Sequence, residues 1–457
     1  MKRVVFLTLI LMVLIPVIWI FVYQFEGKKP VVDMSLPSLY LKKAYEMSLK
    51  VSDNKTGLRK VMVSIMQKGK ETILLEKQYK SKGFLGVVPG SKIINDTFTI
   101  PVHFWKYGMT DGDAVIRIMV SDYSWRGWNK GNISYTEKKV IIDSKPPKVA
   151  VLTKRHNIER GGAALVIYKL FEKNIKSGVK VGENFFPGQS GLFENKDIYA
   201  AFFALSHLQG PESQISVLAE DMAGNITKRG FYHYIRDKNF RTDILNISDH
   251  FLNQKVIDFD VDGKNGSFQG EKNPLLKKFL YINKKIRKRN VEEVLSIPQI
   301  SENKKLWDGK FLRLKGAARR AGFADHRIYK YKGKEIDRAT HLGIDLASTA
   351  NASVKAANSG TVILAREIGI FGNTVIIDHG FGLCSLYSHL SLISAKKGDA
   401  VKKGDEVGST GMTGLAGGDH LHFSMIVHNV FVNPVEWWDN SWIKNNITSK
   451  INFVNQM

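Results

Sequence analysis

The amino-terminal segment is apolar without interruption. Residues 4–23, VVFLTLILMVLIPVIWIFVY, contain no charged side chain and directly follow Lys2 and Arg3. A run of about twenty apolar residues can cross a bilayer as a helix, and Pro16 is tolerated in such a helix. No small-x-small cleavage site follows the run, which favours an uncleaved anchor over a signal peptide. The two basic residues predict a cytoplasmic amino end, so the rest of the chain is expected to be exported.

Hydrophobic and polar residues then alternate along two segments that follow one plan, residues 30–145 and 146–238. SDNKTGLRKVMVSI (52–65) matches EKNIKSGVKVG (172–182), because each has a polar turn, a glycine and an alternating strand. Short alternating strands between turns predict two small β-sandwiches. Both segments also resemble bacterial immunoglobulin-like modules, in which an Asp-x-x-Gly-Asn turn such as that at 221–225 is common. That resemblance implies a spacing or adhesive role.

The pattern changes to helical spacing after residue 238. In NPLLKKFLYINKKIRKRNVEEVLSI (273–297), apolar residues recur at mostly helical intervals with Lys and Arg between them. We interpret residues 239–309 as a helical connector, and its charge run as a solvated helix face rather than a binding patch. Alternating strands separated by glycines return in residues 310–440, which predicts an antiparallel β domain, and residues 441–457 are interpreted as a tail.

The chain is therefore predicted to be mainly β, with a cytoplasmic stub and transmembrane anchor at residues 1–29. Its 457 residues suggest roughly three domains, and 44% hydrophobic and 24% charged residues are typical of folded protein. Cys384 is the only cysteine, so no intrachain disulfide can form, and its apolar neighbours indicate a core position. The formal net charge of +24 suits a cell wall or lipid headgroups, or follows a basic proteome. Nucleic acid is not expected as a partner of an exported chain.

Histidines gather in three short stretches of the last third. HLGID (341–345), LYSHL (386–390) and DHLHF (419–423) are separated by the predicted short strands. Residues two apart on a strand project from the same face, about 7 Å apart. His420 and His422 are therefore expected to face one cavity, while the two apolar residues that alternate with them enter the core.

The first stretch needs a different backbone shape. On a flat strand His341 and Asp345 would lie about 13 Å apart, too far to share one ion. Gly343 permits a bend or a bulge that brings the two side chains together. No glutamate follows His341 as in the helical His-Glu-x-x-His motif, and the glycine also disfavours a helix.

These residue types fit a catalytic zinc site. Such a site typically has three protein ligands and a fourth position for water, and His341, Asp345 and one histidine of the His420/His422 pair meet that requirement. Zinc lowers the pKa of its bound water towards about 7, so that the water can attack an amide carbonyl. His389 and the other histidine of the pair remain to orient the water, transfer its proton and stabilise the oxyanion.

The same stretches, with GSTGMTGLAGGDHLHF (408–423) and KKGDAVKKGDEVG (396–408), resemble the lysostaphin/LytM-type zinc endopeptidases of peptidase family M23. The motifs occur in the order of that family and span roughly residues 310–440. The resemblance implies that His341, Asp345 and His422 bind Zn²⁺. It also implies that the remaining two histidines, His389 and His420, act in catalysis.

Four further residues are candidates beside this set. Many members of the family have Gly-Pro before His-Leu-His, whereas this chain has Gly-Asp; Asp419 could tune His420 or contact substrate, or it is a neutral difference. Tyr387 could either hydrogen-bond substrate or pack the groove wall. His379 ends a strand at a turn, and His326 is expected at the surface.

The leading hypothesis is a membrane-anchored zinc endopeptidase that cuts peptide cross-links of peptidoglycan. It implies a single-pass protein of the inner membrane, with its carboxyl-terminal domains in the periplasm or cell-wall space. The alternative is a non-enzymatic LytM-type activator or envelope scaffold, as in relatives that have lost their zinc ligands. A protease for glycine-rich proteins is a third possibility. Other cell-wall enzymes are possible partners. The bond that is cut stays open in the sequence.

Overall fold

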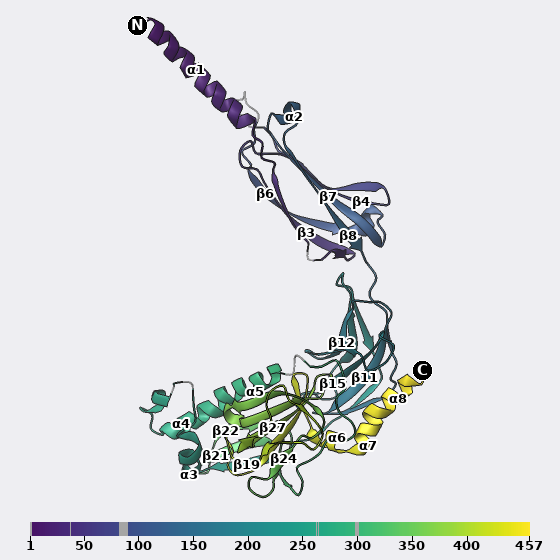
Figure 1. The fold of residues 1–457 in the computed structure, drawn as a ribbon, viewed down its shortest axis with the longest axis vertical. Coiled ribbons are helices and arrows are strands. Elements are labelled where there is room, and N and C mark those ends of the chain that lie inside the picture. Colours follow the sequence, from purple (N-terminus) through teal and green to yellow (C-terminus); the bar gives the residue numbers. More distant parts are fainter. Residues whose placement is uncertain (1, 37, 82–89, 262, 264, 298–300) are drawn as a thin grey trace. The chain divides into compact units, whose positions relative to one another are not determined.

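The computed structural model describes residues 2–36, 38–81, 90–261, 263, 265–297 and 301–457. The chain divides into two compact units. The first unit comprises Met1–Pro146 with Glu220–Ile226, and the second comprises Pro147–Ala219 with Thr227–Met457. The prediction of a mainly β chain with one apolar amino-terminal helix is confirmed (Figure 1).

The amino-terminal helix α1 spans Lys2–Gln24 and contains Pro16. Among the described residues it is the one helix long and apolar enough to cross a membrane, over Arg3–Gln24. An uncleaved signal anchor and a removable signal sequence share these properties, so the choice between them rests on the sequence argument above.

Two sheets form the rest of the first unit. One has the strand order β1-β3-β6 and the other the order β2-β8-β7-β4-β5. A single hydrophobic core joins the sheets, since it contains Leu49 of β3, Val61 of β4 and Ile116 of β7. This arrangement is a β-sandwich, and its immunoglobulin-like class stays a prediction. The strands are β1 Val31–Ser35, β2 Tyr40–Leu41, β3 Ala44–Ser52, β4 Leu58–Gln67, β5 Lys70–Gln78, β6 Asn95–His103, β7 Gly112–Asp122 and β8 Ile133–Ile142.

The second unit begins with another group of strands. Two four-stranded sheets have the orders β14-β15-β11-β9 and β13-β12-β16-β17, and β10 pairs with β18. The strands are β9 Val149–Val151, β10 His156–Glu159, β11 Ala163–Leu170, β12 Lys176–Val181, β13 Asn184–Pro187, β14 Gln189–Ser190, β15 Ile198–Ala204, β16 Ile215–Glu220, β17 Ile226–Gly230 and β18 His233–Arg236.

The predicted connector contains helices and also one strand. Strand β19 (Thr242–Ile247) pairs in parallel with β21 (His326–Tyr331), which pairs in turn with β22 (Lys334–Thr340). Helix α3 (Asp249–Phe251) follows β19, and a π-helical stretch joins α4 (Pro274–Tyr281) to α5 (Arg287–Ser296). In Figure 1 these helices lie beside the strands of the carboxyl-terminal sheet.

The carboxyl-terminal strands build the sheet that carries the histidines. Its order is β20-β23-β31-β27-β26-β25-β29, with β32 also paired to β31, and a small sheet has the order β24-β30-β28. The strands are β20 Ala318–Ala321, β23 Ile344–Ala347, β24 Ser353–Lys355, β25 Gly360–Ile368, β26 Gly372–Asp378, β27 Leu383–Leu390, β28 Leu392–Ile393, β29 Ala400–Val401, β30 Glu406–Ser409, β31 Leu421–Val427 and β32 Val430–Val432.

The predicted tail, residues 441–457, is helical and packs on β11 of the same unit, where Lys450 Nζ donates to the carbonyl oxygen of Leu165 at 2.9 Å. Helices α6 (Pro434–Trp438), α7 (Asn440–Ile443) and α8 (Ser449–Asn455) follow β32. Trp437 is fully buried against Phe202 of β15 and Phe311. The core of the second unit therefore continues from its first strands into the carboxyl-terminal sheet.

Candidate active site

The register of two paired strands places Asp345 and His422 opposite each other. In the antiparallel pair β23–β31, Asp345 is the direct partner of His422. Side chains of paired residues project from the same face of a sheet, about 4.5–5.5 Å apart at Cβ. His420 and His422 both line one cavity, whereas Leu421 and Phe423 are buried in the core, as the alternation predicted.

Gly343 lies between His341 and Asp345 and packs closely against His422. A Cβ atom on this glycine would lie 2.5 Å from both His422 Nε2 and Ser424 Oγ. The imidazole of His422 thus occupies the space where a side chain at residue 343 would be. The chain bends at Gly343, and His341 Nε2 lies 2.9 Å from Asp345 Oδ1, although the two residues are four positions apart.

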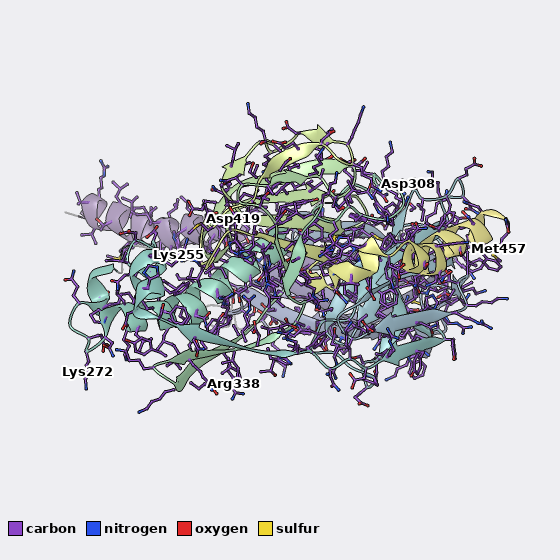
Figure 2. All side chains as sticks on the ribbon, turned by 90° about the horizontal axis from the view of Figure 1, so that it is seen from below. Lys255, Lys272, Asp308, Arg338, Asp419 and Met457 are labelled. Carbon is purple, nitrogen blue, oxygen red and sulfur yellow. The ribbon has the colours of Figure 1, made fainter. Side chains whose placement is uncertain are left out.

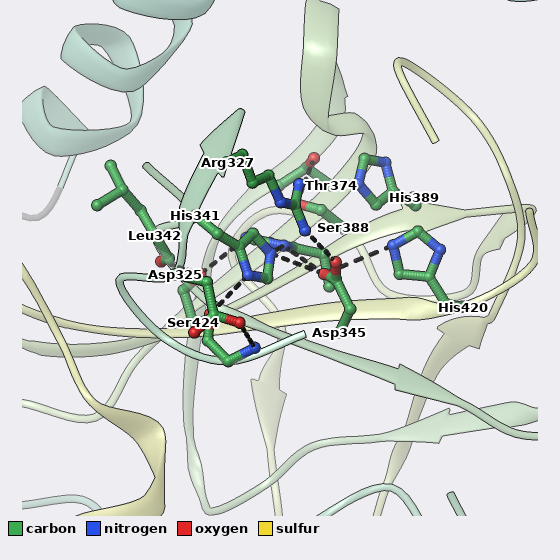
Figure 3. A network of polar contacts seen from close by, with 12 residues as sticks. Asp325, Arg327, His341, Leu342, Asp345, Thr374, Ser388, His389, His420 and Ser424 are labelled. Carbon is green, nitrogen blue, oxygen red and sulfur yellow. Dashed lines mark hydrogen bonds and ion pairs between the residues drawn. The ribbon is translucent and has the colours of Figure 1, made fainter. Parts of the chain in front are cut away.

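The three side chains converge and are buried, and Figure 3 shows His341 and Asp345 pointing towards each other. His422 Nδ1 lies 2.9 Å from Asp345 Oδ1 and 2.9 Å from His341 Nε2. One potential ligand atom from each residue lies within 4.8 Å of the other two, and all three residues are buried. Two imidazoles and a carboxylate are common zinc ligands.

Hydrogen bonds on the outer side of each ring determine where its proton lies. His341 Nδ1 is 2.8 Å from the carbonyl oxygen of Gly322 and must donate to it. Ser424 Oγ donates to the carbonyl oxygen of Leu342, so it accepts from His422 Nε2 at 3.1 Å. In the neutral rings, His341 Nε2 and His422 Nδ1 therefore carry lone pairs. Two lone pairs and a carboxylate oxygen that face one another fit a divalent cation.

His389 and His420 lie beside this cluster. The centroids of their rings are 4.9 Å apart, and the His389 ring is 5.8 Å from that of His422. His389 Nδ1 donates to the carbonyl oxygen of Thr413 and His420 Nδ1 to that of Gly418, at 2.9 and 2.8 Å. In the neutral form of each ring, the Nε2 atom therefore carries no proton. His420 Nε2 lies 3.5 Å from Asp345 Oδ1.

A β-bulge turns His389 towards the cluster. Between β26 and β27, Ser388 and His389 together oppose Thr374, and His389 has a φ of 63°. A bulge of this kind interrupts the alternation of side chains along a strand. Tyr387 and His389 consequently do not share an environment: Tyr387 accepts hydrogen bonds from Ala357 N and Ser385 Oγ in the core. The expectation that Tyr387 lines the groove is wrong.

Burial favours the neutral form of two histidines of the site, whereas at His420 the lowering effect of burial is outweighed by Asp345, which raises the pKa. Burial lowers the pKa of His422 to about 4, and it lowers that of His389 well below the ordinary value, with the charges of neighbouring histidines adding to the effect. Burial alone would raise the pKa of Asp345, but the histidines around its carboxylate, His341 foremost, hold it well below its usual range. Neutral imidazoles and an ionised carboxylate are the forms that bind metal ions.

Arg327 is a site residue that the sequence analysis missed. Its Nη2 donates to Asp345 Oδ2 at 2.7 Å, so the carboxylate offers only Oδ1 to the two imidazoles (Figure 3). Arg327 and Tyr329 lie two residues apart on β21, and both line the cavity beside the histidines. The alternation of HRIYKY marks their shared face, but the strand lies outside the motifs that carried the resemblance.

Two further candidates, His379 and Asp419, make hydrogen bonds within the protein. His379 is fully buried between Ser359 O and Ser385 Oγ, each at 2.8 Å, and burial lowers its pKa to about 4. Asp419, labelled in Figure 2, accepts hydrogen bonds from Thr410 Oγ1 and Asn351 N, which tie two loops together.

Two simpler expectations are confirmed. His326 is exposed and Cys384 is fully buried, as the sequence predicted.

The fold and the site together define a mainly β domain with a buried His–Asp–His cluster suited to a metal ion. Residues 339–434 match the model of peptidase family M23, so the chain contains a peptidase M23 domain. The match covers about a fifth of the chain.

Proteins with related sequences carry names that agree with this domain. The chain is 38% identical over 98 residues to peptidoglycan DD-endopeptidase ShyA of Vibrio cholerae, covering 21% of this chain and 23% of that protein. It is 35% identical over 133 residues to DD-carboxypeptidase/endopeptidase Mpg of Neisseria meningitidis, covering 28% and 31%. The chain thus spans less than a third of the length of either relative. The family and these names support a peptidase.

Among solved structures, the catalytic domain of the antimicrobial peptidase lysostaphin from Staphylococcus simulans is 26% identical. The alignment covers 29% of this chain and 98% of that domain, with a TM-score of 0.25.

Proposed function

We propose that this chain is a membrane-anchored, zinc-dependent endopeptidase that hydrolyses peptide cross-links of peptidoglycan. The observation that carries the proposal is the convergence of His341, Asp345 and His422 within a peptidase M23 domain. Relatives named as peptidoglycan DD-endopeptidases support the choice of substrate. The apolar helix α1 supports the anchor.

In this proposal His341 Nε2, Asp345 Oδ1 and His422 Nδ1 hold the zinc ion. Bound zinc supplies Lewis-acid chemistry, which activates water for attack on an amide carbonyl. Gly322 O and Ser424 Oγ hold the two rings in the binding tautomer through their outer nitrogens. The rings are then already in the tautomers that bind a metal ion.

His389 and His420 are the residues proposed to move protons. The Nε2 atom of each neutral ring can accept a proton from water and return it to the leaving amine. Their Nδ1 atoms are held by Thr413 O and Gly418 O, so the rings cannot turn away without losing a hydrogen bond. A protonated Nε2 can also donate to the oxygen that gains charge during the attack.

The test uses the full chain, purified in detergent, with zinc and isolated sacculi. We expect soluble muropeptides with cleaved cross-links, identified by mass spectrometry, and none with the His341→Ala variant. Intact cross-links after digestion with well-folded wild-type protein would contradict the proposal. Metal analysis of the same sample separates the alternatives, because an activator or scaffold without enzymatic activity needs no stoichiometric zinc.

A further inference from the structure

The predicted connector forms one wall of the cavity beside the histidines. This cavity has a volume of about 320 Å³ and also contains His341, His389, His420 and His422 in its lining. Strand β19 and helices α3, α4 and α5 contribute the apolar residues Leu245, Ile247, Phe251, Phe279 and Val291. A substrate bound at the histidines would therefore contact the connector as well as the peptidase sheet.

The charges that line the cavity are unequal. Two guanidinium groups, those of Arg287 and Arg327, line it together with a single carboxylate, that of Asp345. Arg327 Nη2 pairs with this carboxylate, whereas Arg327 Nε is buried without a hydrogen-bond partner. The cavity thus has an excess of positive charge, which a cation at the three ligands would increase. Such a cavity favours an anionic group on the substrate.

Arg287 is the cation without a counterion. It follows the π-helical stretch Ile282–Ile286 and is half-buried. Within the described part of the chain, no carboxylate lies within 4 Å of its guanidinium. The absence of a protein counterion at this position leaves its charge available to a ligand.

Neutral groups hold Arg287 in place. Its Nε and Nη2 donate to Asn283 Oδ1 at 3.0 and 2.8 Å, and its Nη2 lies 3.4 Å from Tyr329 Oη. Asn283 is 3% exposed and is itself fixed by Asp337 Oδ2 at 2.8 Å. A guanidinium oriented in advance by an amide and a phenol loses little side-chain entropy when an anion binds.

We propose that Arg287 is the anchor of a subsite for a substrate carboxylate, and that the apolar wall holds the aliphatic part of the same peptide stem. This inference rests on the proposed function and narrows its substrate to cross-links between stems with free carboxyl groups. A glycine bridge offers neither a carboxylate for Arg287 nor side chains for the wall. Guanidinium and carboxylate groups form strong charge-assisted hydrogen bonds.

The experiment compares two substrates on three forms of the full chain. The substrates are a purified cross-linked muropeptide dimer with free stem carboxyl groups and the same dimer after amidation. The proteins are the wild type, Arg287→Gln and the matched control Lys288→Gln, which removes a charge from the exposed face of the same helix. We expect the wild type and the control to prefer the free acid by about tenfold or more in kcat/KM, and Arg287→Gln to lose this preference.

A second variant and a binding measurement complete the test. Arg287→Lys keeps the charge but not the planar fork, and we expect it to retain only part of the preference. Calorimetry with a free-acid stem tetrapeptide should give a Kd about tenfold higher or more for Arg287→Gln than for the wild type.

Different failures have different meanings. Equal cleavage of both dimers by the wild type would overturn the subsite and leave the proposed endopeptidase standing. Cleavage of neither dimer would contradict the proposed function, and equal tetrapeptide affinity of wild type and Arg287→Gln would then still overturn the subsite.

Discussion

Two buried clusters of potential metal ligands, one in each compact unit, differ in where their protons lie. In the first unit Glu26, Asp53 and Asp122 place carboxylate oxygens within 4.8 Å of one another, as His341, Asp345 and His422 do in the second. All six residues are buried. The closeness and burial of the ligand atoms alone would give both clusters the same role.

Hydrogen-bond donors surround the acidic cluster. Thr56 donates to Glu26 through both its amide and its hydroxyl group. The amides of Lys55 and Gly57 donate to Asp53, and Asn132 donates to Asp122 through its amide and its side chain. These contacts satisfy the carboxylates within the protein and close the turns that follow β3 and β7. The carboxylates of the acidic cluster therefore already have hydrogen-bond donors from the protein itself.

The histidine cluster has the opposite arrangement. Its donors, the outer nitrogens of the rings, point away from the centre to Gly322 O and Ser424 Oγ, while acceptor atoms face inward. Acceptors that face one another repel unless a cation lies between them. The comparison teaches that acceptor atoms without hydrogen-bond donors indicate a metal site better than the mere presence of histidine and carboxylate residues.

The largest expected effect separates the two clusters directly. Asp345→Asn should lose the stoichiometric metal and reduce endopeptidase activity about a thousandfold, because Lewis-acid catalysis is worth several kcal/mol. Asp122→Asn should leave both unchanged in protein that remains folded. Elemental analysis and sacculus digestion measure the two quantities. If metal content fell only in Asp122→Asn, the assignment of the clusters would be reversed.

A somewhat smaller effect is expected from closing the space at Gly343. In Gly343→Ala the new methyl group would meet His422 Nε2 and Ser424 Oγ at 2.5 Å, so the imidazole must shift from its ligand position. We expect metal affinity, measured by competition with a chelator, to fall about a hundredfold or more. Gly230→Ala is the matched control, because no atom lies within 4 Å of its added methyl group. Unchanged affinity in Gly343→Ala would show that the ring position is not decisive.

Ser424 tests the role of the ring tautomer. Ser424→Ala removes the acceptor that holds the proton on His422 Nε2, and we expect metal affinity to fall about 10-fold to 100-fold. The control Ser385→Ala removes a similar bond to His379, which lies away from the cluster. It should lower thermal stability and leave metal affinity intact. The same loss of affinity in both variants would indicate a general packing effect.

The smallest effect concerns Asp53 in the acidic cluster. Burial, with added repulsion from Glu26 and Asp122, raises its pKa to about 6. Because the folded pKa lies above the unfolded value of about 3.9, the unfolded state loses its proton first as pH rises. The contribution of Asp53 to the free energy of unfolding is therefore fully present below pH 4 and is lost as the pH rises through about 6.

Asp53→Asn should therefore make the free energy of unfolding of the first unit depend less on pH between pH 4 and pH 7. It should also raise the melting temperature of this unit at pH 7. About 2–4 °C is expected for each kcal/mol gained, and calorimetry of the full chain at several pH values measures it. Asp96→Asn is a control of opposite sign, because Lys77 and Tyr79 hold the pKa of Asp96 below its usual value against the effect of burial. A melting temperature of Asp53→Asn that followed the wild-type pH profile would contradict the assignment.

Local sequence patterns determined much of the architecture. Residues whose side chains alternate on a strand share a face whatever the rest of the chain does, so the mainly β fold and the joint exposure of His420 and His422 to one cavity could be predicted. The apolar amino-terminal helix could also be predicted, because its residues are almost all apolar. The five histidine and aspartate residues of the candidate site do come together, while their chemical roles stay proposals.

Only the tertiary structure decided the details that depend on contacts between distant segments. The bulge at His389 reverses the expected face of Tyr387, and Gly343 matters because a ring from β31 packs against it. Arg287 comes from a helix face that the sequence analysis interpreted as solvated, and Arg327 from a strand outside the motifs that carried the resemblance. The physical reason is that the periodicity of a sequence shows only which residues share a face of the same helix or strand. Register, bulges and packing between elements are selected by the whole core at once.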